Sequence, residues 1–276
     1  MADPVKNVAM IGLGRMGRPM ARHLAAKGFS VVGYDVSDAA RKAAQADGIE
    51  TASSPAAAAK KCDLAIVVVG FDDEVEAALF GKNGVVAAAP KGAVVAVAST
   101  IAPRTMKKLG ARFDGTGVTP LDIPLCRGEP AAEAGKLQVM GGGDSAAFER
   151  CRPAFEAFSD AVHHVGALGA GQVGKMVNNL ILWACISANT EGLRLAGALG
   201  VPADALRLAL LDSSASNWAL ETQIDRNPMP WAEKDMSIVL AEADIARLSL
   251  PLCGALKEVI KGIKIARGEG MPGHAD

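Results

Sequence analysis

The sequence predicts an α/β protein in which a doubly wound parallel sheet is followed by an all-α domain. Two observations support this fold class. Short apolar runs alternate with segments of helical spacing up to about residue 167. Beyond that point strand-like runs disappear and every segment has helical spacing. We therefore predict two domains, residues 1–167 and residues 168–276.

The first alternation is a strand, a glycine-rich turn, a helix and a second strand, within about thirty residues as in a βαβ unit. Residues 7–12 form a short apolar run that ends in glycine, and residues 18–27 have helical spacing. Gly28 ends this helix, and residues 29–35 supply the second strand.

The rest of the N-terminal part repeats this alternation. Its strands are predicted where apolar residues run without interruption, because a parallel sheet covered on both faces has no polar side. These strands are 63–70, 92–100, 117–124 and 136–143. The helices between and after them are predicted at 38–46, 55–61, 73–80, 103–113 and 144–158.

The C-terminal part is expected to contain only helices. A helix over residues 171–198 has no internal proline and is long enough to join the two domains. Glycine and proline residues mark the loops between the later helices. Those helices are predicted at 202–211, 216–223, 233–247 and 251–267.

Composition excludes several classes of function. The formal net charge is −1, and no basic stripe with interleaved aromatic residues points to a nucleic acid. The apolar stretch 177–188 is interrupted by Asn178, Asn179 and Ser187, so it is too short and too polar to span a membrane. The N-terminus lacks the apolar core of a signal peptide. We expect a cytoplasmic protein.

Cysteine and histidine spacing gives no sign of a disulfide framework or a metal site. The five cysteines are scattered and odd in number, which fits free thiols in a reducing compartment. The four histidines, His274 among them, have no ligand spacing with those cysteines. We therefore predict no bound metal.

A dinucleotide-binding loop is predicted between the first strand and the first helix. Residues 12–17 read Gly-Leu-Gly-Arg-Met-Gly, a GxGxxG motif in the strand–turn–helix context that makes it informative. Gly12 permits the tight turn, Gly14 lets the backbone approach a pyrophosphate, and Gly17 lets helix and strand pack closely. These features indicate a Rossmann domain, and Leu13 and Met16 belong to the same cofactor loop.

Asp35 indicates which dinucleotide is bound. It follows the second strand, where an acidic side chain accepts hydrogen bonds from the ribose hydroxyls of NAD and repels the 2′-phosphate of NADP. The cofactor is therefore expected to be NAD rather than NADP. The nearby Arg41 is the one residue that argues for NADP, if its side chain reaches the ribose.

Two longer motifs resemble the β-hydroxyacid dehydrogenases, the family that contains 3-hydroxyisobutyrate dehydrogenase. The opening IGLGRMGRPMARHL of residues 11–24 is similar to the family's first motif, and residues 169–179 match its GxGxxxKxxNN pattern completely. The resemblance covers residues from about 6 to about 265. It implies an NAD-dependent oxidoreductase that interconverts a small 3-hydroxy acid and its semialdehyde or keto acid, assembled as a homodimer or homotetramer.

The resemblance implies that Lys175 is the catalytic acid/base and that Asn179 assists it. Lys175 and Asn179 are four residues apart, so they project from one side of a helix. The helix is otherwise apolar, so we expect the lysine to line a cleft. Gly171 is expected to leave room for the substrate.

The substrate loop departs from the family pattern. The family has Asp-Ala-Pro-Val-Ser-Gly-Gly, and its serine and neighbouring N–H groups hold the substrate carboxylate. This chain has Asp122-Ile-Pro-Leu-Cys126-Arg127-Gly128. Arg127 suggests a substrate with a second anionic or a stronger acid group, such as a sulfonate or phosphonate. The alternative is that Arg127 points to solvent or forms a structural ion pair.

Three further segments are assigned to the cofactor by resemblance. Val69 and Gly70 correspond to the family segment near the adenine ribose, and Thr100 corresponds to the segment beside the nicotinamide. Lys234 corresponds to a late lysine that reaches back to the cofactor.

Three other functions are compatible with this fold. One is a sulfonate- or phosphonate-aldehyde reductase of the same family, which Arg127 favours. The others are an imine reductase and a non-catalytic nucleotide sensor. Lys175 argues against both, because such relatives carry another residue at its position.

Overall fold

The computed structural model describes residues 3–224 and 228–270, which form two compact units. The first unit, Met1–Lys175, contains the sheet, and we call it the sheet unit. The second, Met176–Asp276, contains only helices among its described residues, and we call it the helical unit. The predicted fold class, a Rossmann-type sheet followed by an all-α region, is confirmed.

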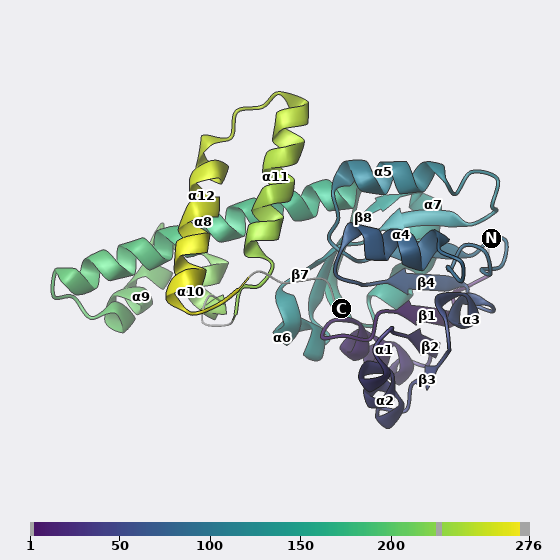
Figure 1. Ribbon diagram of the computed structural model, residues 1–276. Helices are drawn as coiled ribbons and strands as arrows, with labels where there is room; N and C mark the ends of the chain where they lie inside the picture. Colours follow the sequence, from purple (N-terminus) through teal and green to yellow (C-terminus); the bar gives the residue numbers. More distant parts are fainter. Residues whose placement is uncertain (1–2, 225–227, 271–276) are drawn as a thin grey trace. The chain divides into compact units, whose positions relative to one another are not determined.

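Six parallel strands form most of the sheet, in the order β3-β2-β1-β4-β5-β6 (Figure 1). Three more strands extend it: β8 is antiparallel to β6 and β7 and parallel to β9. The strands are β1 (Asn7–Ile11), β2 (Ser30–Tyr34), β3 (Glu50–Thr51), β4 (Leu64–Val67), β5 (Val94–Val97), β6 (Thr119–Asp122), β7 (Leu125–Cys126), β8 (Leu137–Gly143) and β9 (Ser159–Gly166).

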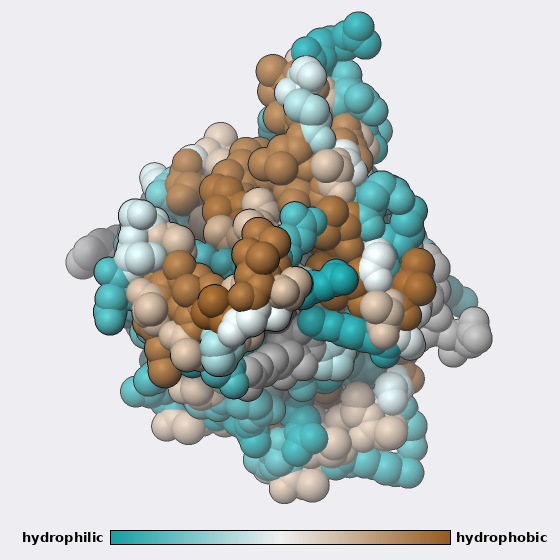
Figure 2. Space-filling view, turned by 90° about the vertical axis from the view of Figure 1, so that its left-hand side faces the viewer, coloured by the Kyte–Doolittle hydropathy of each residue, from teal (hydrophilic) through white to brown (hydrophobic). Residues whose placement is uncertain are grey.

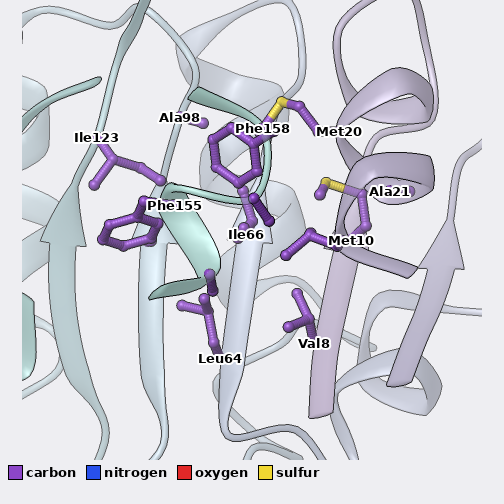
Figure 3. Close-up of a cluster of buried hydrophobic side chains, with 14 of the residues drawn as sticks. Val8, Met10, Met20, Ala21, Leu64, Ile66, Ala98, Ile123, Phe155 and Phe158 are labelled. Carbon is purple, nitrogen blue, oxygen red and sulfur yellow. The ribbon is translucent and has the colours of Figure 1, made fainter. Parts of the chain in front are cut away.

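Helices cover both faces of this sheet, so alternate residues of each central strand enter two different hydrophobic clusters. Met10 and Ile66 belong to one cluster, together with Phe155 and Phe158 (Figure 3). Ile11 and Ala65 belong to the other. Burial on both faces explains the uninterrupted apolar runs. The helices are α1 (Gly17–Ala26), α2 (Asp38–Ala46), α3 (Pro55–Ala59), α4 (Asp72–Phe80), α5 (Pro103–Ala111), α6 (Gly128–Glu133) and α7 (Ser145–Phe155).

The predicted long helix is present as α8 (Ala170–Ala198), and the four later helices also form. They are α9 (Ala203–Leu211), α10 (Trp218–Thr222), α11 (Ala232–Ala246) and α12 (Pro251–Ala266). Trp183, Met236 and Ile260 are central to the hydrophobic cluster of the helical unit. Within the described ranges, no helix has both the length and the apolar character needed to cross a membrane.

Four elements were not predicted. β3 and β7 are two residues long and α6 is short, so none of them produces a measurable periodicity. β9 was missed because its sequence, Ser-Asp-Ala-Val-His-His-Val-Gly, is polar, as suits a strand at the edge of a sheet.

The predicted boundary near residue 167 marks the point where strands end. The compact units divide later, between Lys175 and Met176, because the first turns of α8 pack on the sheet unit. Gly171 and Gly174 lie against Met140 of β8.

Candidate active site

The loop between β1 and α1 is closed by two glycines. Gly12 has φ +101°, and a Cβ added to it would lie 2.1 Å from the Val68 carbonyl oxygen. A Cβ on Gly17 would lie 2.0 Å from the Gly12 carbonyl oxygen. Any side chain at either position would therefore push the loop away from the sheet.

Gly14 differs from its neighbours, because the space where its Cβ would lie is open to 4 Å. The adjoining helix α1 begins after Met16, with no side-chain hydrogen bond to its first turn among the described residues and no acidic residue there. Backbone N–H groups at such a helix start attract anions. This loop therefore fits the pyrophosphate of a dinucleotide.

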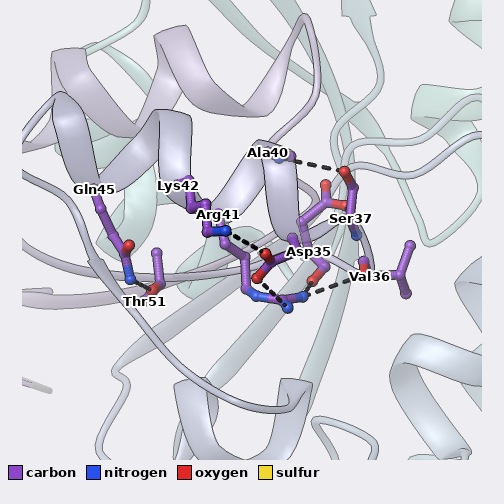
Figure 4. Close-up of polar contacts among 9 residues, drawn as sticks. Asp35, Val36, Ser37, Ala40, Arg41, Lys42, Gln45 and Thr51 are labelled. Carbon is purple, nitrogen blue, oxygen red and sulfur yellow. Dashed lines mark hydrogen bonds and ion pairs between the residues drawn. The ribbon is translucent and has the colours of Figure 1, made fainter.

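Asp35 is oriented by the same loop. Its Oδ2 accepts a hydrogen bond of 2.7 Å from the Leu13 N–H, and its Oδ1 accepts one of 2.8 Å from the Ser37 N–H. The carboxylate follows β2 directly (Figure 4), and its hydrogen bond with Leu13 places it beside the glycine-rich turn. This is the position at which an acidic side chain meets the ribose in dinucleotide-binding domains.

Arg41 of helix α2 binds backbone carbonyl groups of the segment just before that helix. Its Nη1 contacts the Asp35 carbonyl oxygen and donates to the Val36 carbonyl at 3.2 Å (Figure 4). Its Nη2 donates to Asp38 at 3.1 Å. The guanidinium is therefore committed to local contacts.

The ends of β4 and β5 are joined by a buried hydroxyl. Ser99 Oγ accepts a hydrogen bond of 2.8 Å from the Val69 N–H, and Thr100 follows Ser99 directly. The Gly70 N–H donates to Glu74 at 2.7 Å. Since both of these N–H groups are used internally, a cofactor near Val69 and Gly70 would meet the Val69 side chain or the carbonyl groups of the two residues.

Asp122 lies at the end of β6 and is completely buried, with 0 % exposure. Its Oδ1 accepts from the Gly169 N–H and its Oδ2 from the Gln172 N–H, each at 2.7 Å. Burial raises the pKa of this carboxyl group, and the backbone donors oppose the rise. Asp122 thereby satisfies two N–H groups at the start of α8.

The expected role of Gly171, to leave room for a substrate, is wrong. A Cβ at this position would lie 2.4 Å from the Met140 carbonyl oxygen and 2.8 Å from Asp122 Oδ2. The glycine is needed because α8 approaches β8 and Asp122 closely, so its missing side chain makes room for protein rather than for a ligand.

Lys175 is half-buried, and its Nζ lies 4.0 Å from the Sγ of Cys126. Cys126 ends β7 and is 2 % exposed. The predicted acid/base and the predicted substrate loop therefore meet within the sheet unit.

Arg127 is directed elsewhere. Its Nη1 forms an ion pair with Asp160 of β9 and donates to the Lys136 carbonyl at 3.0 Å. Its backbone is left-handed, with φ +80°, and Gly128 follows with φ +73°. The structural ion pair considered from the sequence is thus the arrangement found, and substrate binding by Arg127 would require this pair to open.

The helical unit carries the two remaining predicted residues. Asn179 of α8 is buried, and its Oδ1 accepts a hydrogen bond of 3.0 Å from Asn178. Lys234 of α11 lies over the Trp231 ring, with its Nζ 5.4 Å from the ring centroid. The adjacent Asp235 accepts from the Trp183 indole at 3.2 Å.

Three polar residues of the site were not predicted: Ser99, Asp122 and Gln172. Each is almost fully buried in the sheet unit. A sequence signal existed for two of them. Asp122 ends a buried strand, and Gln172 stands among small and apolar residues in the first turn of α8. Polar residues in such places are usually hydrogen-bonded to backbone.

The cysteines and histidines of the described ranges form no metal site. Burial raises the pKa values of Cys62 and Cys151 to about 12, so these thiols stay protonated at neutral pH. Within the part of the chain that the structure describes, no three His, Cys, Asp or Glu side chains are grouped to hold a metal ion. His274 lies outside the described residues.

Comparisons with known proteins identify the family of this chain. Residues 7–166 match the NAD binding domain of 6-phosphogluconate dehydrogenase, and residues 169–275 match the NAD-binding domain of NADP-dependent 3-hydroxyisobutyrate dehydrogenase. An NAD-dependent L-serine dehydrogenase of Pseudomonas aeruginosa is 36% identical over 226 residues, which cover 82% of this chain and 75% of that protein.

Two further similarities extend over nearly the whole chain. The 2-hydroxy-3-oxopropionate reductase of Escherichia coli is 33% identical over 91% of this chain and 89% of its own length. The solved structure of Mycobacterium tuberculosis 3-hydroxyisobutyrate dehydrogenase with L-serine has a TM-score of 0.87 and 26% identity, and it covers 96% of both chains.

A Rossmann-type sheet with a GxGxxG loop, joined to an all-α region, defines a dinucleotide-binding protein, and the matched domain is one that binds NAD. The matched family models and the similar proteins identify the family within this class. The chain belongs to the β-hydroxyacid dehydrogenase family, whose members include 3-hydroxyisobutyrate dehydrogenase, and it is a dehydrogenase that acts on CH–OH groups with NAD(P).

Proposed function

We propose that this protein oxidises the hydroxyl group of a small 3-hydroxy acid with NAD, and that Lys175 is its general acid/base. The observation that carries the proposal is the approach of Lys175 Nζ to Cys126 at 4.0 Å. This distance places Lys175, the lysine of the GxGxxxKxxNN motif, beside residues 122–128, which correspond to the family's substrate loop.

The chain's residues fit a dinucleotide, with the pyrophosphate beside Gly14 and the start of α1 and the adenosine ribose at Asp35. Asp35 favours NAD, because its carboxylate would repel a 2′-phosphate. The engagement of Arg41 with the Asp35 and Val36 carbonyls supports the same choice. When bound, the nicotinamide supplies the acceptor for a hydride.

Oxidation of the alcohol removes a proton from its oxygen and a hydride from its carbon, and leaves a carbonyl group. Lys175 takes the proton at Nζ in this direction and returns it in the reverse direction. Asn179 orients the hydroxyl group or the lysine through its side-chain amide. Cys126 and the backbone N–H of Gly128 hold the acid group of the substrate.

The substrate class follows from the family and from this loop. Relatives are named for L-serine, 3-hydroxyisobutyrate and 2-hydroxy-3-oxopropionate, whose alcohol forms are all small 3-hydroxy acids. We propose a carboxylate substrate, because the ion pair of Arg127 with Asp160 leaves its charge neutralised. A sulfonate or phosphonate substrate would have to displace Asp160.

The test is NAD reduction with a panel of 3-hydroxy acids that includes carboxylate, dicarboxylate, sulfonate and phosphonate members. Lys175→Ala should abolish turnover and leave NAD binding intact, whereas Lys60→Ala, on the exposed surface of the same unit, should change neither. Turnover that survives in Lys175→Ala would contradict the proposed role. Wild-type NAD binding without turnover of any member would favour an imine substrate or a sensing function.

Cofactor choice is tested separately with Asp35→Asn. Loss of the carboxylate should weaken NAD binding and improve NADP binding, since the repulsion of the 2′-phosphate is removed. Direct titration of each cofactor measures the ratio of dissociation constants. An unchanged ratio would show that Asp35 only supports the loop through Leu13.

We also propose that the protein is a homodimer or homotetramer. Large apolar side chains of the helical unit are exposed on α8, α9 and α12. Figure 2, which views the molecule from the left-hand side of Figure 1, shows hydrophobic residues (brown) gathered on that face. Leu199 is 73% exposed, and no residue within α9 is buried. Contiguous apolar surface of this kind is typical of an interface.

A further inference from the structure

A chain of buried hydrogen bonds runs through the sheet unit beside Lys175. Its side chains, Asp122, Gln172 and Ser99, are each no more than 3% exposed. It starts at the end of β6, passes through the first turn of α8 and finishes at the ends of β5 and β4. None of these three side chains has a role in the proposed chemistry.

The first part of this series of hydrogen bonds is the contact between Asp122 and the start of α8. Both carboxylate oxygens accept backbone N–H groups, from Gly169 and Gln172. The surroundings are shaped for the carboxylate, because a Cβ on Gly142 would lie 2.6 Å from Oδ1 and a Cβ on Gly171 would lie 2.8 Å from Oδ2. An acceptor-only side chain suits this place, since both of its neighbours are donors.

The second part is the side chain of Gln172. Its Oε1 accepts from the Ile101 N–H at 3.2 Å, and its Nε2 donates to the Ser99 carbonyl at 2.8 Å. One amide thus holds the backbone on both sides of Thr100. Ser99 in turn accepts the Val69 N–H at 2.8 Å, which extends the chain to β4.

Lys175 follows Gln172 by less than one helical turn on α8. A rotation or a shift of the first turn would therefore move the lysine directly. The same turn is tied to the segment that contains Thr100, the residue assigned to the nicotinamide side. The hydrogen bonds of Asp122, Gln172 and Ser99 thus connect the helical turn before Lys175 with the backbone on either side of Thr100.

We propose that Asp122 and Gln172 are positioning residues, which hold the start of α8 against the Ser99–Ile101 segment and so place Lys175 relative to the cofactor. This inference rests on the proposed function. It deepens that function, because it assigns the placement of the acid/base to side chains that touch neither substrate nor cofactor.

Asp122→Asn is the first variant to test it. The amide has one acceptor where the carboxylate has two, so one N–H of α8 would face an NH₂ group and the first turn would shift. A misplacement of about 1 Å costs on the order of 10²-fold in rate. We expect kcat to fall by about that factor, with the KM for NAD little changed. Gln172→Met, which keeps the length without hydrogen bonds, should act in the same direction.

Asp144→Asn is the matched control. Asp144 also caps a helix of the sheet unit, because its Oδ1 accepts from the Ala147 N–H at 2.8 Å at the start of α7. This control should leave kcat unchanged. An equal loss of kcat in Asp144→Asn and Asp122→Asn, or no loss in Asp122→Asn, would overturn the proposal.

A double-variant cycle separates positioning from folding. Small primary amines are added to Lys175→Ala to restore measurable turnover, and Asp122→Asn is then introduced into this background. If Asp122 acts through Lys175, the second change should cost little, because the group that it places is absent. The same 10²-fold loss in both backgrounds would show a structural effect and overturn the proposal.

The outcomes also distinguish this inference from the proposed function. Wild-type turnover that disappears in Lys175→Ala supports the function whatever the result at Asp122. Backbone amide exchange over residues 169–175 gives a readout that does not depend on activity. Exchange there should accelerate in Asp122→Asn, and unchanged exchange would contradict the positioning role.

Discussion

The sheet unit and the helical unit bury their apolar residues in different ways. In the sheet unit the central strands lie between two hydrophobic clusters, and side chains such as Phe148, Phe155 and Phe158 are completely buried. In the helical unit, Leu195, Leu199 and Leu208 are mostly exposed. The sheet unit therefore encloses its apolar core, whereas the helical unit leaves large apolar side chains exposed. We propose that a second copy of the chain covers them.

Buried polar groups differ between the two units as well. In the sheet unit, Asp122 and Gln172 are hydrogen-bonded to backbone. In the helical unit, Lys264 of α12 is 1% exposed and forms an ion pair with Glu233 of α11 at 2.8 Å. Lys264 Nζ also donates to the Pro230 carbonyl at 3.3 Å. The buried polar groups of the sheet unit are thus held mainly by backbone, whereas the central contact in the helical unit is an ion pair between two helices.

The chain provides separate reporters for the two units. All three tryptophans, Trp183, Trp218 and Trp231, belong to the helical unit, so indole fluorescence follows its unfolding. The single tyrosine, Tyr34, belongs to the sheet unit. Far-ultraviolet circular dichroism reports both units, and the two signals together show which unit a substitution destabilises.

The largest effect is expected from Phe155→Ala in the sheet unit. Phe155 is fully buried, with its ring centroid 5.3 Å from that of Phe148. Its removal should lower the free energy of unfolding of this unit by roughly 4 kcal/mol, through lost burial and the cavity that remains. Urea unfolding followed by circular dichroism would measure the loss. A shift of the tryptophan signal alone would contradict the assignment of this core to the sheet unit.

A slightly smaller effect is expected from Lys264→Met in the helical unit. The change leaves Glu233 buried without its cation, which should cost about 3 kcal/mol. Tryptophan fluorescence should show the destabilisation. The double variant Lys264→Met with Glu233→Leu should recover much of the loss, because both charges are then removed. Equal destabilisation in the single and double variants would show that the ion pair itself stabilises the unit.

Leu208→Glu should change assembly more than stability. Leu208 is 58% exposed on α9, so the effect on the free energy of unfolding should stay within about 0.5 kcal/mol. The buried charge should nevertheless disfavour an interface between copies, and light scattering after size exclusion should report a smaller species. Val165→Glu, at an exposed position of β9, is the matched change in the sheet unit and should leave the assembly intact. If the wild type, Leu208→Glu and Val165→Glu all have the same assembly, the interface does not include Leu208.

The smallest effect concerns the surface pair of Arg18 with Asp47. The hydrogen bond from Arg18 Nε, at 2.6 Å, holds the pKa of Asp47 below its usual value of 3.8. A lowered carboxyl pKa stabilises the fold above the unfolded-state value, and this stabilisation is lost as pH falls through the folded-state value. Asp47→Asn should reduce the loss of stability between pH 7 and pH 3, by roughly 0.3 kcal/mol. The measurement is the urea midpoint of unfolding at pH 7 and at pH 3, for the wild type and the variant. If the midpoint falls by the same amount between the two pH values in both proteins, the prediction is contradicted.

The strands and helices that could be predicted share one property, a repeated pattern of apolar residues. The central strands β1, β4 and β5 are buried on both faces, so their sequences contain almost no polar residue. The edge strand β9 has no such pattern, because Asp160, His163 and Val165 are exposed along it. Element prediction therefore succeeded in the interior of the sheet and failed at its margin.

The site shows a similar division. The glycine-rich loop and Asp35 were predicted from local sequence because their geometry is set within one βαβ unit. The contacts of Arg127 and Asp122 could not be predicted, since their partners Asp160 and Gly169 come from distant segments. The expected role of Gly171 was wrong for the same reason, because the atoms beside it belong to β8 and β6.

The amino-acid sequence by itself determined the fold class, the dinucleotide loop and the spacing of Lys175 and Asn179, because these depend on residues close together in the chain. Only the tertiary structure decided that Arg127 pairs with Asp160, that Cys126 meets Lys175 and that Asp122 caps α8. Such contacts form when segments far apart in the sequence pack together in the folded unit. Their distances depend on how the whole unit packs rather than on any local pattern.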